Sequence, residues 1–244
     1  MITMVGASMA KYAGIKSGGQ SVNEMMSQLP NSIQAIFGIS GFDISEISGY
    51  YGMLFMYIAV IATIHAVLLG SDIISKEERD KTSEFLFVKP ISRARVVTKK
   101  LIAGLINVIA LNIVTLVSSL YFVDFFSENS LPIDSISLLM VALLFLQLLF
   151  FFVGTAIAAV VKKPKKSATM AASILLSCYI LSFLININQN LDGLKYLTPF
   201  KYFDAKAIIA DNTLDLVYIS LSIVLIGAMV AITYITFRRR DLNI

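Results

Sequence analysis

The chain has 244 residues; 57% of them are hydrophobic, only 15% are charged, and the formal net charge is +4. Soluble globular domains average about 45–50% apolar and about 25% charged residues, so this composition excludes an ordinary soluble domain. The mean hydropathy of +0.79 is typical of a protein that packs in lipid.

An N-terminal segment, residues 1–49, precedes the first long apolar run. Residues 1–10 (MITMVGASMA) are apolar, but a membrane helix needs about 20 such residues. They also lack the basic start of a signal peptide. We interpret them as the outer end of a first membrane helix whose remainder is absent. The alternative is a protein with five helices and a translocated N-terminal tail.

Five later segments are long and apolar enough to cross the bilayer as helices. None carries a lysine, arginine or glutamate in its central part. Their approximate bounds are 50–73, 101–123, 136–161, 168–186 and 216–237. The sequence therefore predicts an all-α polytopic membrane protein, with residues 1–244 forming a single transmembrane domain.

Basic residues gather in three of the segments that connect or follow these helices. The loop 74–100 carries eight of them, residues 162–166 carry four, and residues 238–240 carry three. Fifteen of the twenty lysines and arginines thus lie on one side of the membrane. The positive-inside rule makes that side cytoplasmic.

The loops on the opposite side, 124–135 and 187–215, are acidic or of mixed charge. Within the second, Leu197–Ile209 mixes aromatic residues with lysine and aspartate, which predicts a helix in the membrane interface. Because charge is segregated by side, the net positive charge reflects membrane topology. No basic face with interleaved aromatic residues indicates a nucleic-acid partner.

Catalytic, metal-binding and cofactor-binding motifs are not recognisable. His65 is the only histidine, which excludes a zinc-binding HExxH pair, and no serine lies in a GxSxG context. The glycine-rich stretch Gly14–Ser21 lacks the Gly-Lys-Ser/Thr ending of a phosphate-binding loop. We therefore predict that the chain is not an enzyme and cannot hydrolyse ATP by itself.

Polar side chains within the predicted spans are candidates for a functional role. They are His65, Asn107, Asn112 and Gln147. Our first expectation for each is a hydrogen bond to a neighbouring helix, and the second is a place along a transport pathway. The small residues Gly154 and Ala158 predict a close helix approach, either within this chain or between two subunits.

The charged loop 74–100 contains a short apolar island, residues 85–88 (FLFV). Asp80 or Thr82 can cap a helix of about two turns here, and Glu84 would lie near its positive end. An exposed apolar cluster of this kind indicates contact with another protein. The alternative is that it rests on the lipid headgroups.

The segment Ile73–Lys100 resembles the cytoplasmic loop of ABC-2 type transporter permeases. Its matching stretches are EER at 77–79, TSEFL at 82–86, PISR at 90–93 and KK at 99–100. The stretches PFKY at 199–202 and FRRRDL at 237–242 also resemble the family, and the similarity runs over about residues 11–244. The family usually has glycine before the threonine of the loop, where this chain has Lys81.

The resemblance implies a permease subunit with six spans and a short cytoplasmic coupling helix that docks on an ABC ATPase. Two identical or paralogous permease subunits would form the substrate pathway, in a bacterial cell membrane and as part of an exporter. ATP and Mg²⁺ would be bound by the ATPase, and this chain would bind no cofactor of its own. The residues expected to couple the two proteins are Glu77, Glu78, Arg79, Asp80, Thr82, Glu84, Phe85, Leu86, Val88, Pro90, Ser92 and Arg93.

Three other functions remain open at this point, one of them a non-transporting assembly or immunity protein that would bind an ATPase but pass no substrate. The second is a transporter or channel driven by an ion gradient, although no predicted span has a carboxylate near its middle. The third is an intramembrane enzyme, which would depend on His65.

Overall fold

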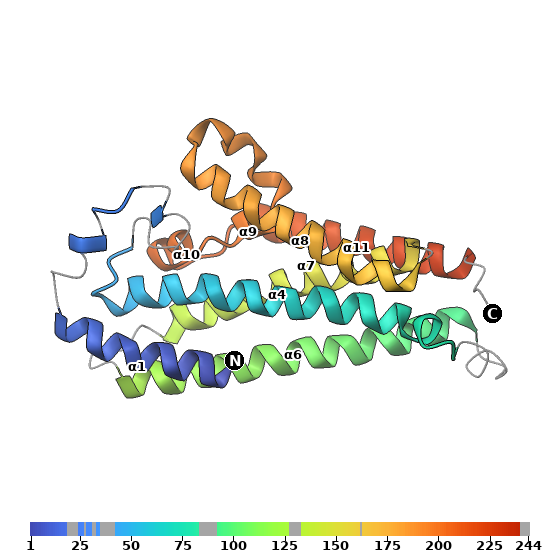
Figure 1. The fold of residues 1–244 in the computed structure, drawn as a ribbon, viewed down its shortest axis with the longest axis horizontal. Coiled ribbons are helices and arrows are strands. Elements are labelled where there is room, and N and C mark those ends of the chain that lie inside the picture. Colours follow the sequence, from blue (N-terminus) through green and yellow to red (C-terminus); the bar gives the residue numbers. More distant parts are fainter. Residues whose placement is uncertain are drawn as a thin grey trace.

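The computed structural model describes a bundle of long helices (Figure 1). The described residues are all of 1–244 except 19–23, 27, 31–32, 35–41, 83–91, 127–132, 162 and 240–244. Within them, every regular element is helical, and five helices are long and apolar enough to cross a membrane. These are α4 (Ile47–Arg79), α6 (Arg93–Phe126), α7 (Ile133–Val160), α8 (Pro164–Ile187) and α11 (Leu216–Arg239). The predicted all-α membrane fold with five spans is confirmed.

Two of these helices extend further than their apolar runs predict. The helix α4 has 33 residues and α6 has 34, so each is about 50 Å long against about 30 Å of hydrocarbon. The extensions include Lys76–Arg79 and Arg93–Lys100, which we expected in the connecting loop. Lysine, arginine and glutamate favour helix, while hydropathy reports only the part that lies in lipid.

The helix α7 occupies the centre of the bundle. Of its most apolar stretch, 61% is buried inside the chain, compared with 50% for α4 and 11% for α11. It contacts α4, α6, α8 and α11. The helix α11 therefore exposes most of its surface to lipid or to another protein, while α4 and α7 form the core.

The helices α4 and α7 cross at two glycines. A Cβ atom added at Gly70 would collide with the carbonyl oxygen of Phe151, and one added at Gly154 would collide with that of Val67. Each glycine thus faces the backbone of the other helix, which lets the two helices approach closely. The close approach expected for Gly154 occurs within this chain, and Ala158 is buried.

The N-terminal helix α1 (Ile2–Gly18) lies beside α6 and also contacts α4 (Figure 1). Val5, Met9 and Tyr12 are buried there. The Tyr50 hydroxyl donates to the carbonyl of Ser8 at 2.7 Å, and the Tyr12 and Tyr50 rings are 5.1 Å apart. The helix continues eight residues past the apolar stretch 1–10 in which we predicted it.

Two short helices replace the single interfacial helix expected at Leu197–Ile209, and a 3₁₀ helix precedes them. In chain order the three are the 3₁₀ helix η1 (Gln189–Leu197), α9 (Pro199–Tyr202) and α10 (Ala205–Asp211). Pro199 disfavours a helical conformation at Thr198, which is extended, and so separates η1 from α9. Asp204 caps α10 by accepting the Lys206 N–H at 3.0 Å, and this separates α9 from α10.

The end of α4, the start of α6, the α7–α8 junction and the end of α11 all lie at one end of the bundle (Figure 1). We call this the basic end, because the described members of all three basic clusters lie there. The helices α9 and α10 lie away from the basic end, towards the opposite end (Figure 1).

Candidate functional site

The candidate site is the junction of α4 and α6 at the basic end. We call residues 72–82 and 92–100 the loop root, because they carry the two ends of the predicted coupling helix. Five of the predicted coupling residues lie outside the described residues, namely Glu84, Phe85, Leu86, Val88 and Pro90. The coupling helix itself therefore stays a prediction.

The helix α4 ends in a Schellman motif, a turn that satisfies its last carbonyl groups. The Thr82 N–H donates to the carbonyl of Glu77 at 2.8 Å, and the Lys81 N–H donates to that of Glu78 at 3.4 Å. Asp80 is the C-cap residue, and Lys81 has a φ of 56°, in the left-handed region. This turn sets the direction in which the chain leaves the membrane helix.

Lys81, the residue in the left-handed conformation, stands where the ABC-2 type permeases that this chain resembles usually have glycine. Glycine adopts positive φ without strain, whereas a residue with a Cβ atom pays about 1–2 kcal/mol for it. Lys81 nevertheless keeps this conformation and both hydrogen bonds of the motif. The departure from the family pattern therefore leaves the turn geometry intact.

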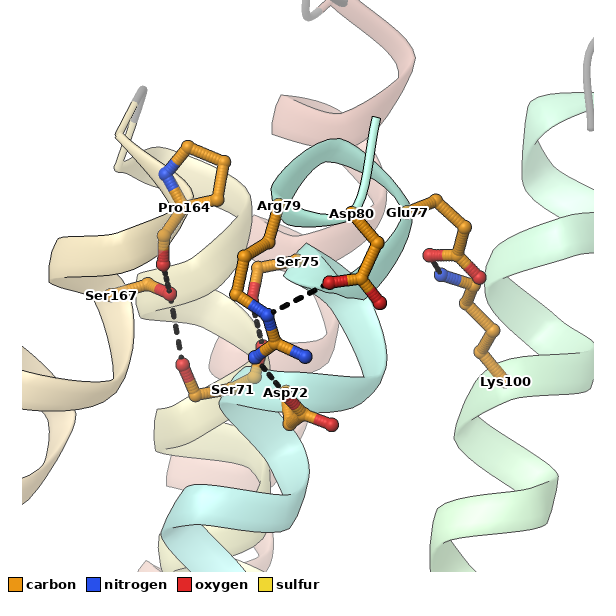
Figure 2. A network of polar contacts seen from close by, with 9 residues as sticks. All are labelled: Ser71, Asp72, Ser75, Glu77, Arg79, Asp80, Lys100, Pro164 and Ser167. Carbon is orange, nitrogen blue, oxygen red and sulfur yellow. Dashed lines mark hydrogen bonds and ion pairs between the residues drawn. The ribbon is translucent and has the colours of Figure 1, made fainter. Parts of the chain in front are cut away.

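The Arg79 guanidinium lies between the carboxylates of Asp72 and Asp80 at the end of α4 (Figure 2). It pairs with Asp72, two turns back along the helix, and its Nε donates to Asp80 Oδ1 at 3.2 Å. All three side chains are more than a third exposed, so solvent screens the pairs. Asp80 thus pairs with Arg79 and is the C-cap residue of α4, while its expected role as a cap for the coupling helix concerns residues outside the described part of the chain.

An ion pair joins the two helices of the loop root. Glu77 on α4 accepts a hydrogen bond from the ammonium of Lys100 on α6 (Figure 2). The Lys100 side chain is only 13% exposed and that of Glu77 is 27% exposed. Partial burial makes this pair less screened than that of Arg79. The pair therefore links the end of α4 to the first turns of α6.

A buried hydroxyl pair joins α4 to the start of α8 (Figure 2). The Ser71 hydroxyl donates to the Ser167 hydroxyl at 3.1 Å, and Ser167 donates onward to the carbonyl of Pro164 at 2.7 Å. Both serine side chains are fully buried. The loop root is thereby connected to the second basic segment of the chain.

The second part of the loop root, residues 92–100, starts at Ser92. Its hydroxyl accepts the Arg95 N–H at 3.4 Å and its carbonyl accepts the Val96 N–H at 3.2 Å. Ser92 thus caps α6, and Arg93 is the first residue of that helix. The predicted residues Ser92 and Arg93 are brought to the same end as Glu77 and Arg79.

Two of the intramembrane polar residues meet in the core. The Asn112 amide on α6 donates to Gln147 Oε1 on α7 at 3.1 Å and to the carbonyl of Met140 at 3.1 Å. Asn112 is 8% exposed and Gln147 is fully buried. This is the interhelical hydrogen bonding expected for both residues.

The other two make no hydrogen bond to another helix within the described part of this chain. His65 is exposed on α4 beside Ile61 and Leu68, and it makes no hydrogen bond within the described part of the chain. Asn107 is exposed as well, and its amide donates to the carbonyl of Ala103 on its own helix at 3.2 Å. Their sequence positions did not reveal which face of each helix is turned outward.

Sequence reasoning missed four residues of this junction: Ser71, Asp72, Lys100 and Ser167. Asp72 had a weak signal, because it lies seven residues before Arg79 and therefore on the same helix face. Ser71, Lys100 and Ser167 had none, because their contacts join helices that are distant along the chain. The described residues hold no group of three or more His, Cys, Asp or Glu side chains that could bind a metal ion. The contacts described at this junction link α4 to α6 and to α8.

Comparison with curated proteins gives no significant match. A family profile described as "ABC-2 family transporter protein" matches residues 2–242, which is nearly the whole chain. The match includes the five long apolar helices, both halves of the loop root and the segment between them. The chain therefore belongs to the ABC-2 family of transporter proteins and is a multi-pass membrane permease component of an ABC transporter.

Proposed function

We propose that this permease subunit exports its substrate by coupling to ATP hydrolysis in a separate ABC ATPase. The ATPase would bind ATP and Mg²⁺ and dock on the loop between α4 and α6 from the cytoplasm. Two permease subunits, identical or paralogous, would form the substrate pathway between them in the cell membrane of a bacterium.

The observation that carries this proposal is the construction of the loop root. The charged helix extensions lift the loop beyond the hydrocarbon, where a soluble partner can reach it. The Glu77–Lys100 pair ties α4 to α6, and the Ser71–Ser167 pair ties α4 to α8. A force applied to the loop would therefore reach three membrane helices together.

The apolar residues of the loop supply the contact in this proposal. Phe85, Leu86 and Val88 are the large apolar side chains that a cleft in the ATPase would accept, as buried anchors do at many interfaces. The charges of Glu78, Arg93 and Arg95 would surround them and guide association more than they strengthen it. The ion pairs that Glu77 and Arg79 make within the chain would position the loop.

Co-purification of the permease with its ATPase tests the docking. The double change F85D/L86D places two charges in the proposed apolar contact, and we expect ATPase recovery to fall at least tenfold while membrane insertion is unchanged. The control K165D/K166D adds two carboxylates at the α7–α8 junction on the same side, and it should retain the ATPase. Full recovery of the ATPase with F85D/L86D would disprove the docking site.

Transport by reconstituted vesicles tests the source of energy. We expect substrate movement to require ATP, to stop when F85D/L86D removes the ATPase, and to persist when an ionophore collapses ion gradients. Transport that needs a gradient and ignores ATP would instead identify a secondary transporter.

A further inference from the structure

A cavity of about 210 Å³ lies between α4, α7 and α8, beneath the short helices α9 and α10. This volume is large enough to hold several water molecules. The cavity is in the half of the bundle away from the basic end, and it shares no residue with the loop root. The coupling function does not account for it.

One wall of the cavity is aromatic. Tyr179 of α8 meets the edge of the Phe200 ring with the ring centres 5.2 Å apart, and Phe200 packs on Phe150 at the same distance. Phe203 stacks on Phe145 at 5.8 Å, which holds the next part of the wall in place. Aromatic pairs at these spacings are stabilising and give the cavity a fixed apolar surface.

The rim of the cavity is polar and carries a net positive charge. The Lys201 ammonium donates to Asn186 Oδ1 and lies 3.3 Å from Asp204 Oδ2, while Asp204 Oδ1 accepts the backbone N–H of Lys206. The one carboxylate of the rim is therefore already engaged by Lys201. The side chain of Lys206 makes no hydrogen bond or ion pair within the described residues.

The polar and apolar parts of the cavity lie at different depths in the membrane. Asn186 is one residue from the end of α8, and Tyr179 is seven residues deeper, about 10 Å along the helix axis. Lys201 of α9 donates to Asn186, so the polar rim lies at that end of α8, while Tyr179 carries the aromatic wall farther along α8 into the bundle. This change of polarity with depth matches the polarity of an amphiphile oriented in that leaflet.

We propose that the cavity binds an amphiphile with an anionic head group, whose head pairs with Lys206 and whose apolar chain lies against Tyr179, Phe200 and Phe203. Lysine at a membrane surface favours anionic lipids. The same chemistry is offered by a resident anionic phospholipid and by a free single-chain amphiphile. The site is independent of the ATPase-docking proposal, since it involves other residues and the other end of the bundle.

Tryptophan fluorescence tests the site directly, because the chain contains no tryptophan. The variant F200W places a single indole in the aromatic wall, and Y179W places one at the neighbouring position of the same wall as a second reporter. The variant I223W places one on the exposed face of α11 and reports ordinary lipid contact. Each is reconstituted in phosphatidylcholine nanodiscs with an equal fraction of brominated phosphatidylglycerol or brominated phosphatidylcholine, since bromine quenches nearby indoles.

A second arm of the experiment distinguishes a resident anionic phospholipid from a free single-chain amphiphile. Bromoundecanoate, a free single-chain anion, is added to nanodiscs that contain only unbrominated phosphatidylcholine. Saturable quenching of F200W in this arm identifies a free amphiphile as an occupant. A preference for brominated phosphatidylglycerol in the first arm identifies a resident lipid.

We expect F200W and Y179W to be quenched about fivefold more strongly by the anionic brominated lipid than by the zwitterionic one, the preference that one lysine provides at a membrane surface. I223W should show no preference. Adding K206Q to either reporter should remove the preference, and adding K195Q should preserve it, because Lys195 is paired with Asp192 outside the cavity. Saturable quenching by bromoundecanoate that K206Q abolishes would support the site equally. Equal quenching by both lipids together with no saturable quenching by bromoundecanoate would overturn the proposal, as would a preference that survives K206Q.

Discussion

Lys81 holds a left-handed backbone conformation at the exact point where α4 ends and the loop begins. A Cβ atom makes this conformation costly, yet the two hydrogen bonds of the Schellman motif depend on it. We infer that the turn stabilises the protein by more than the strained backbone of Lys81 destabilises it. The residue at position 81 should therefore affect stability through how readily its backbone adopts the left-handed conformation.

Substitutions at Lys81 test this inference. K81G removes the strain but increases the entropy of the unfolded chain, so we expect stability to be unchanged or raised by up to about 1 kcal/mol. K81V places a β-branched residue at positive φ and should lose about 1–2 kcal/mol and reduce ATPase recovery. Thermal unfolding and co-purification measure the two effects. Equal stability of K81V and the unsubstituted protein would contradict the argument.

Asn112 supplies the hydrogen bonds between α6 and α7 in the membrane core. N112A would leave the buried Gln147 Oε1 without this donor, and we expect a loss of about 1–2 kcal/mol of stability. The control N107A removes an amide that bonds only to its own helix on an exposed face, so it should change stability by less than about 0.5 kcal/mol. Unfolding in a denaturing detergent measures the stability of both variants. Equal losses of stability would mean that the Asn112–Gln147 hydrogen bond does not stabilise the protein.

At the scale of helices, the α4–α7 crossing depends on the absence of two side chains. G154A would push its Cβ atom against the backbone of α4, and overpacking of this kind typically costs about 1–3 kcal/mol. G227A makes the same chemical change on α11, where an added Cβ atom meets no neighbour. Melting temperatures of the two variants in one detergent should show a loss for G154A alone. Similar melting temperatures would show that α4 and α7 separate without penalty.

The pairing of α4 with α6 can be tested by exchanging its charges. E77K sets two ammonium groups against each other at the loop root, and we expect weaker ATPase stimulation because the two helices no longer move together. The swap E77K/K100E restores an ion pair and should recover most of the activity. K99E reverses an exposed neighbouring charge on the same helix and serves as the control. A swapped variant as impaired as E77K would show that the pair does not act as a link.

On the scale of the whole molecule, the orientation predicted from charge can be measured by labelling. Cys178 is the single cysteine, so C178S gives a background free of thiols. In that background, K165C at the start of α8 should react with an impermeant reagent only from the cytoplasmic side, and D192C in η1 only from the other side. The reverse pattern would invert the topology and place the loop root outside the cell.

The large features of this architecture were predictable because each is written in a continuous stretch of sequence. Apolar runs of about 20 residues predicted the five spans, and clusters of lysine and arginine predicted that three connections share one end. The Glu77–Lys100 and Ser71–Ser167 contacts were not predictable, because they join residues on different helices. The outward face of His65 was also hidden, because an apolar helix that is surrounded by lipid and protein has no polar side to mark its orientation.

The long, continuous helix α4 connects the cavity to the loop root. Phe55, in the cavity wall, and Glu77, in the loop root, stand on the same unbroken helix, about 33 Å apart along its axis. Thermodynamic reciprocity then applies to its two ends: if an amphiphile at one end changes the affinity for the ATPase at the other, the ATPase must change the affinity for the amphiphile by the same factor. A single titration of the nanodisc protein with each ligand, in the presence and absence of the other, would measure that factor twice.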